Sequence, residues 1–235
     1  MIKLRQVYLL AKSRFILFTG KLNAYSALAL AGILGPLVLV GGDLGAGLTT
    51  PGYSLINSSI SSLALTHIGW LQTIGFLALG LLVEVFTAGL LFNVKRGRWF
   101  YLGIFALVLF GFGMLCIGAF NTDPANGLHT RNGMIHQLAT KISFGLFPVA
   151  ALLLAFNFKQ DIEWRLFYKY SLASCIVSIL LAVSLLFFKE GAGYFGLVER
   201  LVVANMLLWV EVMAVNMFRL SLKRSAPVDK EVQIG

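Results

Sequence analysis

Residues 99–120 read WFYLGIFALVLFGFGMLCIGAF, a stretch without a single charged side chain. Because an α-helix rises 1.5 Å per residue, about 20 apolar residues are enough to cross the ~30 Å hydrocarbon core of a bilayer. The stretch is therefore predicted to be a transmembrane helix. The residues that follow, 120–136, read FNTDPANGLHTRNGMIH and bring an Asp, an Arg and two His together before the next apolar run begins.

The composition of the whole chain agrees with a membrane environment. Of its 235 residues, 58% are hydrophobic and 12% are charged, whereas soluble domains carry about 25% charged residues. So few charges cannot cover the surface of a water-soluble protein of this size. The net charge of +9 is spread between apolar runs instead of forming one basic patch. It therefore predicts membrane topology within a lipid bilayer and not a nucleic-acid partner.

Six apolar runs are long enough to span a bilayer. They are too long for the strands of a membrane β-barrel, and they lack the alternation of polar and apolar residues that such strands show. The sequence thus predicts an all-α, polytopic bundle of six transmembrane helices. The predicted spans are about Ala24–Val40, Ile68–Phe92, Trp99–Phe120, Met134–Phe156, Phe167–Phe188 and Gly196–Phe218.

Basic residues between the runs predict the topology. Most of the 19 Lys and Arg residues lie in residues 1–23, in the connections after the second and fourth runs, and in the tail, whereas residues 41–67 contain none. The positive-inside rule therefore places both termini in the cytoplasm. We predict a basic cytoplasmic juxtamembrane segment at 1–23, a transmembrane domain at 24–220 and a disordered cytoplasmic tail at 221–235. The protein is expected in the prokaryotic cytoplasmic (inner) membrane, as a multi-pass protein.

The first outer connection is predicted to contain two features. Residues 41–45, GGDLG, have the composition of a flexible turn. Apolar residues at helical spacing in residues 53–64 predict a short amphipathic helix across the outer mouth of the bundle. The serines of this helix would face either a pocket or water.

Two acidic residues fall inside predicted spans, Glu84 in the second and Glu211 in the sixth. A carboxylate in hydrocarbon is costly, so both are expected to face the interior of the bundle and to lie close to each other. Two roles remain open for them. They form either a relay for protons or cations, or a neutral hydrogen bond that fixes helix packing.

Polar residues gather at the predicted outer ends of the helices. They are expected to line one outward-facing cavity that binds a lipid-like or anionic small molecule, with Lys and Arg holding the anionic group. The predicted binding residues are His67, Arg131, Lys141, Glu199 and Arg200. Two alternatives involve no ligand: Glu199–Arg200 and Asp123–Arg131 are interfacial ion pairs, or the bundle is a scaffold in a homo-oligomer or with a partner membrane subunit.

A metal-dependent hydrolase is the other possibility. Imidazole and carboxylate ligands suit Zn²⁺, which would activate a water for attack on a lipid ester, amide or phosphoester. The candidate ligands are His67, Asp123, His129 and His136, and the candidate catalytic residues are Ser61, Asp123, His129 and His136. His129 and His136 are seven residues apart, which matches no pair of metal ligands on one helix, so one of them would reach in from the loop.

Several short motifs resemble those of a known membrane-protein family. They are, in order, Tyr53 with Ile60-Ser61-x-Leu63, Gly69-Trp70, Phe120-x-x-Asp123 with His129 and His136, and Gly196-Leu197-x-Glu199-Arg200. Over residues 24–220 the chain is similar to the family known as domain of unknown function 998. The resemblance implies a polytopic bacterial or archaeal membrane protein and no particular substrate. The residues to which it points are Ser61, Asp123, His129, His136, Glu199 and Arg200.

The Asp and His pattern also loosely resembles membrane hydrolases that use Ser, Asp and three His ligands. Those enzymes carry a His-x-x-x-His pair on their last helix. The last predicted span of this chain contains no histidine, which counts against the hydrolase interpretation.

Overall fold

The computed structural model describes residues 22–124, 127–189 and 193–224. Within these ranges every regular element is helical, and six helices are each long and apolar enough to cross a membrane. The predicted all-α polytopic membrane protein with six transmembrane helices is therefore confirmed. The long helices are α2 (Ala24–Thr49), α3 (Trp70–Asn93), α4 (Phe100–Ala119), α5 (Arg131–Phe158), α6 (Tyr168–Ser184) and α7 (Phe195–Arg224), and the short 3₁₀ turns are η1 (Ser61–Leu65), η2 (Arg165–Phe167) and η3 (Leu185–Phe187).

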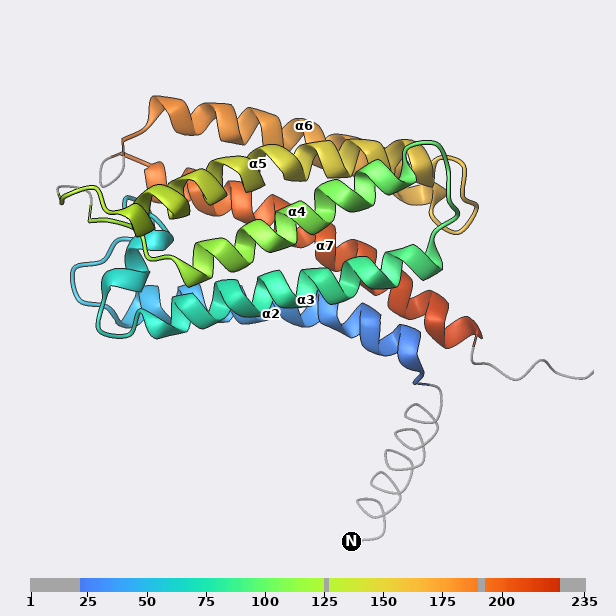
Figure 1. Cartoon of the computed structure of the whole chain (residues 1–235), viewed down its shortest axis with the longest axis horizontal. Helices are drawn as coiled ribbons and strands as arrows, with labels where there is room; N and C mark the ends of the chain where they lie inside the picture. The colour runs from blue at the N-terminus through green and yellow to red at the C-terminus, as the bar shows by residue number, and fades with distance from the viewer. Residues whose placement is uncertain (1–21, 125–126, 190–192, 225–235) are drawn as a thin grey trace, which may run out of the picture.

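The six helices form a closed bundle. Each helix packs on the next one in the chain, and α7 returns to pack on α2 (Figure 1). The number of long helices is even, so the start of α2 and the end of α7 lie at the same end, which we call the terminal end. The connections 94–99 and 159–167 also lie there. We call the opposite end, with connections 50–69, 120–130 and 185–194, the cleft end.

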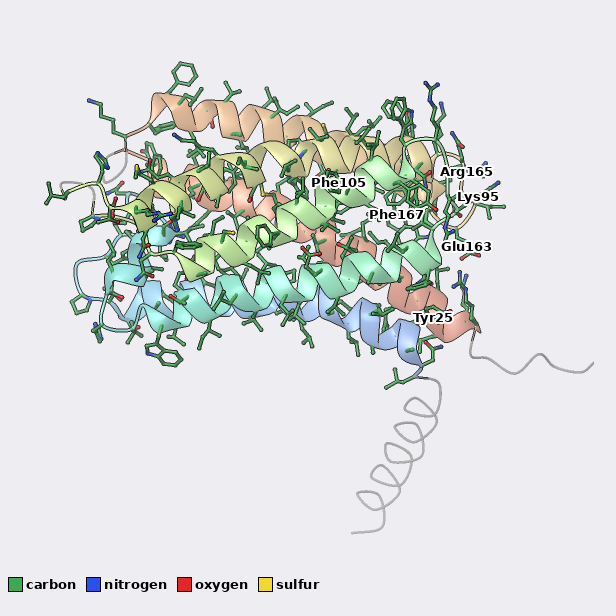
Figure 2. The ribbon with its side chains drawn as sticks, in the orientation of Figure 1. Tyr25, Lys95, Phe105, Glu163, Arg165 and Phe167 are labelled. Atoms are coloured by element: carbon green, nitrogen blue, oxygen red, sulfur yellow. The ribbon has the colours of Figure 1, made fainter. Side chains whose placement is uncertain are left out.

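Charged residues mark the terminal end. Figure 2 shows Lys95, Glu163 and Arg165 together at the tip of the bundle, beyond the apolar side chains such as Phe105 that cover the outside of the helices. Their position is consistent with a water-exposed face. The positive-inside rule still predicts that this face is the cytoplasmic one.

Glycines let the helices approach closely. A Cβ atom on Gly80 of α3 would lie 2.7 Å from the backbone nitrogen of Leu115 and 2.8 Å from the carbonyl oxygen of Gly111, both in α4. Small residues at such positions allow close van der Waals packing, which is a main source of helix association in lipid. Aromatic rings fill the centre, where Phe147 of α5 packs on Phe110 and Trp209, with ring centroids 5.5 Å and 5.7 Å away.

Hydrogen bonds between polar side chains join α6 to α7 along their membrane-spanning parts. Ser171, Ser174 and Ser178 share one face of α6. The Ser171 hydroxyl accepts a hydrogen bond from Trp209 Nε1 at 2.9 Å. The side-chain amide of Asn205 donates to the Ser178 hydroxyl at 2.7 Å and to the Ser174 carbonyl at 3.0 Å. Hydrogen bonds between helices fix α6 against α7 where hydrophobic burial contributes little.

The terminal end is held by side chains that bond to backbone groups of connection 94–99 and of Asn93, the last residue of α3. Asp161 Oδ2 accepts from the Lys95 amide at 2.7 Å. Asn157 accepts from the Gly97 amide and donates to the Lys95 carbonyl, both at 2.7 Å. Trp164, which is fully buried, donates from Nε1 to the Asn93 carbonyl at 3.0 Å. These bonds satisfy backbone groups that lie beyond the helix ends.

Three sequence predictions need correction at element boundaries. The predicted turn at residues 41–45 is wrong, because α2 continues to Thr49. Gly42 lies against the Leu71 carbonyl, so this glycine serves close packing and not a turn. The predicted short helix in connection 50–69 is present but shorter and later than the expected range 53–64, because residues 53–60 are not helical and only η1 at Ser61–Leu65 is. In the C-terminal part of the chain, α7 extends to Arg224. Residues 221–224 are therefore helical and not part of a disordered tail. The predictions for residues 1–21 and 225–235 lie outside the described residues.

Candidate functional site

Arg200 near the start of α7 anchors the first connection to the bundle. Its guanidinium forms a bidentate ion pair with Asp43 of α2, with both N–O distances 2.9 Å. Nη2 also donates to the Tyr53 hydroxyl at 2.7 Å. Nη1 points at the carbonyl oxygens of Leu55, Ser58 and Gly196, at 2.8, 3.0 and 3.1 Å. We call this group of Asp43, Tyr53 and Arg200 the Arg200 anchor.

The Arg200 anchor explains why residues 53–60 are not helical. The carbonyl oxygens of Leu55 and Ser58 accept from Arg200 instead of from amides one helical turn away. The Ile56 carbonyl accepts from the Leu197 amide. The Tyr53 hydroxyl donates to the Ser59 carbonyl at 2.7 Å, and burial raises the pKa of this phenol, so Tyr53 stays protonated and can donate. Because all sides of the guanidinium face protein acceptors, the predicted role of Arg200 in binding an anion does not fit its geometry.

Asp123 holds the connection between α4 and α5. Its carboxylate accepts from the Thr130 hydroxyl at 2.7 Å and from the Thr130 amide at 2.9 Å. The same Thr130 hydroxyl accepts from the Gly133 amide and caps α5. A side chain on Gly133 would collide with the Asp123 carboxylate, so glycine is required there. Asp123 therefore sets the position of this connection through Thr130, and not through the predicted pair with Arg131.

The hydrogen bonds to Asp123 make a pH-dependent prediction. The Thr130 hydroxyl, and then the Thr130 amide, lower the pKa of Asp123 below its ordinary value of 3.8. A lowered pKa means that the stabilising contribution is complete above the ordinary value and is lost as the pH falls through the folded-state value. We expect hydrogen exchange at the Thr130 amide, corrected for its intrinsic rate, to accelerate in that acidic range.

Asp123→Asn is the control for this measurement. It should raise exchange at the Thr130 amide at neutral pH and remove the acidic step. An acidic step of equal size in the variant would contradict the assignment to Asp123.

His136, in the second turn of α5, is buried against the end of α4. Its Nδ1 atom lies 2.8 Å from the carbonyl oxygen of Phe120 and 3.1 Å from that of Ile117. A carbonyl oxygen can only accept, so Nδ1 carries the proton. A neutral imidazole of this tautomer has a lone pair on Nε2. His136 thus satisfies carbonyl groups at the end of α4, and its Nε2 atom has no hydrogen-bond partner among the described residues.

A polar cleft of about 390 Å³ opens at the cleft end. Six of the residues singled out in the sequence line it, together with polar residues that the sequence had not singled out as binding groups, among them Gln137 and Thr140. Thr140 follows His136 by four residues and Lys141 follows Gln137 by four, and this helical spacing was the available sequence signal. The lining residues are Ser59, Ser61, Thr122, Asp123, Pro124, His129, His136, Gln137, Thr140, Lys141, Phe195 and Glu199.

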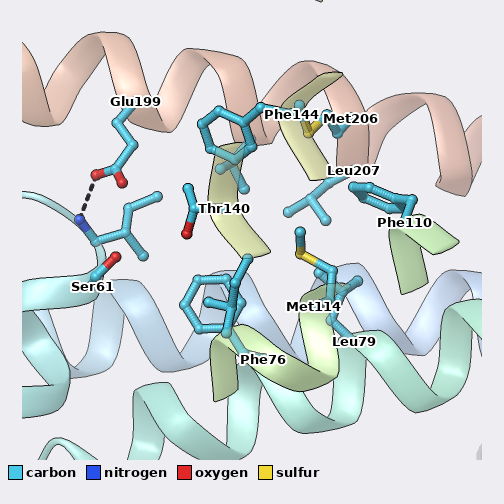
Figure 3. Close-up of a pocket in the computed structure, with 13 residues that line it drawn as sticks. Ser61, Phe76, Leu79, Phe110, Met114, Thr140, Phe144, Glu199, Met206 and Leu207 are labelled. Atoms are coloured by element: carbon cyan, nitrogen blue, oxygen red, sulfur yellow. Dashed lines mark hydrogen bonds between the residues drawn. The ribbon is translucent and has the colours of Figure 1, made fainter. Parts of the chain in front are cut away.

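A small internal pocket of about 20 Å³ adjoins the cleft and shares Ser61, Thr140 and Glu199 with it. Figure 3 shows these polar side chains at one end and apolar side chains such as Phe110 and Met114 at the other. Glu199 Oε2 accepts from the Ile60 amide at 2.6 Å, which fixes this carboxylate at the base of the cleft. The pocket is large enough for one water molecule.

An apolar groove of about 610 Å³ runs from the cleft down the bundle between α5 and α6. Thr140, Lys141, Phe195 and Glu199 line both spaces. The rest of the groove is formed by apolar side chains and Gly145. Its remaining lining residues are Phe144, Gly145, Pro148, Val149, Leu152, Cys175, Ile179, Ala182, Val183, Leu185 and Leu186.

Comparison with known proteins identifies the family. The model of a family described as a protein of unknown function (DUF998) matches residues 33–216. This chain belongs to the DUF998 family. The match covers all six transmembrane helices, α2 and α7 in part. Neither a curated protein nor a solved structure shows significant similarity to the chain.

Not all of the predicted site residues of this DUF998 chain meet in the cleft. Ser61, Asp123, His129, His136, Lys141 and Glu199 do. His67 follows η1 and is exposed, and Arg131 is exposed at the start of α5; neither lines the cleft. Arg200 follows the lining residue Glu199 but does not line the cleft, and its guanidinium is used by the Arg200 anchor.

The two intramembrane acids have different surroundings. Glu84 lies against Gly111 of α4, and its Oε1 atom is buried without a hydrogen-bond partner in the described part of the chain. Glu211 instead lines a groove with Phe167 of η2 and with Arg219. The two carboxylates thus face different helices, and the expected contact between them is not found.

The predicted zinc site does not fit the arrangement of its candidate ligands. Across residues 22–124, 127–189 and 193–224, no three His, Cys, Asp or Glu side chains lie close enough to share a metal ion. His129 Nδ1 is 4.0 Å from Asp123 Oδ2, but Asp123 is occupied by Thr130 and His67 lies elsewhere. A zinc-dependent hydrolase therefore finds no support in this geometry.

Proposed function

We propose that this membrane protein binds a lipid-like molecule with an anionic head group in the polar cleft. The observation that carries the proposal is the position of Lys141. It lies where the polar cleft meets the apolar groove, and it has no ion-pair partner among the described residues. A cation beside apolar side chains is costly unless a counter-charge is supplied. A phosphate or carboxylate head group would supply it.

The other polar groups of the cleft suit the same head group. The Ser61 hydroxyl can donate to head-group oxygens, and His136 Nε2 can accept from a hydroxyl of the ligand. The Thr140 hydroxyl donates to the His136 carbonyl at 2.9 Å, so toward the cleft it can only accept. Asp123 accepts from the Thr130 amide of its own connection, and Glu199 of α7 accepts from the Ile60 amide of connection 50–69. These hydrogen bonds fix where the two carboxylates point, and Lys141 supplies the ammonium group that would hold the anionic head group.

The test is the selectivity of the purified protein between two lipids. The two lipids are phosphatidylglycerol and phosphatidylcholine with identical acyl chains, so that they differ in head-group charge. We expect native mass spectrometry to show that the protein retains phosphatidylglycerol preferentially. Lys141→Gln should reduce this preference about tenfold or more, since a hydrogen bond to a charged group is worth about 1.5–3 kcal/mol. Arg131→Gln, which removes an exposed charge outside the cleft, is the matched control.

Equal retention of the two lipids by the natural protein, or an unchanged preference in Lys141→Gln, would overturn the proposal. An equal loss in Arg131→Gln would show that general surface charge, and not the cleft, selects the lipid.

A further inference from the structure

The apolar groove between α5 and α6 has the dimensions of a site for a single hydrocarbon chain. The wall formed by α6 and η3 extends from Cys175 to Leu186, which at about 1.5 Å per residue is about 16 Å. The hydrocarbon core of a bilayer is ~30 Å thick, so one leaflet is about half of that. The groove thus runs through one leaflet, starting at the end where Lys141 and Glu199 form its polar mouth.

The groove is open toward the side of the bundle. Val149 of α5 and Val183 of α6 stand at its edges and are about half exposed, and Leu186 is 82% exposed. α6 is also the least buried of the six spans. A chain lying in the bilayer could therefore enter sideways between the two helices, without passing through water.

Gly145 lines the groove at a position where any larger side chain would occupy part of the groove volume. A Cβ atom at this position would meet nothing within 4 Å. Glycine in a helix interior costs about 1 kcal/mol relative to alanine, and here close helix packing does not explain it. The missing side chain keeps the groove open below Lys141, which is one helical turn away on α5.

We infer that this groove holds one acyl chain of an anionic lipid from the leaflet at the cleft end, entering laterally between α5 and α6. The inference rests on the proposed function of the cleft, to which it adds the class of ligand and its route. The head group lies at Lys141, and the chain runs along Gly145 and Pro148 toward Cys175. Continuity with the polar cleft distinguishes this groove from the groove that Glu211 and Arg219 line.

A photo-crosslinking experiment tests the inference. The full chain is placed in phosphatidylglycerol nanodiscs that contain a trace of phosphatidylglycerol with a diazirine near the end of one acyl chain. After irradiation, peptide mapping locates the adducts. We expect them to concentrate on α5 and α6 near Leu152 and Cys175, at the deep end of the groove. Gly145→Phe, which fills the groove, should reduce these adducts about tenfold.

Gly41→Phe is the matched control, because Gly41 of α2 also has open space around it and lies outside the groove. It should leave the adducts unchanged. Adducts spread evenly over the lipid-facing helices, or a pattern that is the same in Gly145→Phe, would overturn the acyl-chain site. Neither of these two results would bear on the head-group site, which is tested by the selectivity for phosphatidylglycerol and its dependence on Lys141. Loss of that selectivity alone, with adducts still in the groove, would overturn the proposed head-group site and keep the chain site.

Discussion

Arg200→Met is expected to destabilise the protein by about 3–5 kcal/mol, because it leaves the Asp43 carboxylate buried without its counter-charge. Both side chains of the pair are largely enclosed, with 15% and 11% of their surfaces exposed. The substitution also removes the donors for the Tyr53 hydroxyl and for three backbone carbonyls. Thermal unfolding of the detergent-purified protein, followed by tryptophan fluorescence, would show a strongly lowered midpoint.

The double variant Asp43→Asn with Arg200→Met provides the decisive comparison. Removing both charges should recover part of the lost stability, because the largest cost of the single variant is the unpaired carboxylate. Arg131→Met, at an exposed position, should unfold like the natural protein. A double variant that is less stable than Arg200→Met would contradict this account of the Arg200 anchor.

Trp164→Ala is expected to cost about 3–5 kcal/mol, the usual range for truncating a buried tryptophan. Trp164 is fully buried at the terminal end, and its ring stacks on Phe158 with centroids 5.1 Å apart. Its Nε1 atom donates to the Asn93 carbonyl at 3.0 Å, which ties the connection before α6 to the end of α3. The loss should appear as a lowered unfolding midpoint and as faster hydrogen exchange in residues 94–99.

Trp164→Phe separates packing from hydrogen bonding. It keeps an aromatic ring beside Phe158 and removes the N–H donor, so it should cost about 1–3 kcal/mol, the penalty for leaving the Asn93 carbonyl without its partner. If Trp164→Ala and Trp164→Phe lost the same stability, the hydrogen bond and not the packing would dominate at this end.

The cleft end shows which part of a site can be predicted from residue types. Asp123, His129, His136 and Lys141 could be assigned to one region because they flank a single connection, close together in the chain. Arg200 was assigned to the same cavity with an incorrect role. A guanidinium is equally suited to a ligand and to a carboxylate of its own chain, and the choice depends on Asp43, which precedes it by 157 positions.

The apolar groove could not be predicted at all. In a membrane helix, apolar side chains that face a groove and those that face lipid have the same composition, because hydrocarbon is the solvent on both sides. Gly145 illustrates the difficulty. Nothing in the sequence distinguishes it from Gly80, which packs tightly against α4, yet the two glycines have opposite surroundings.

The sequence by itself determined the number of membrane-spanning helices, because the length and apolar composition of a span follow from the thickness of hydrocarbon that it must cross. It also placed the polar residues at the ends of those helices. Only the tertiary structure decided that α2 extends past Gly45, that Arg200 pairs with Asp43, and that Lys141 lines the cleft without an ion-pair partner among the described residues. Such pairings depend on which helix faces meet, and contacts between helices far apart in the chain leave no local pattern in residue order.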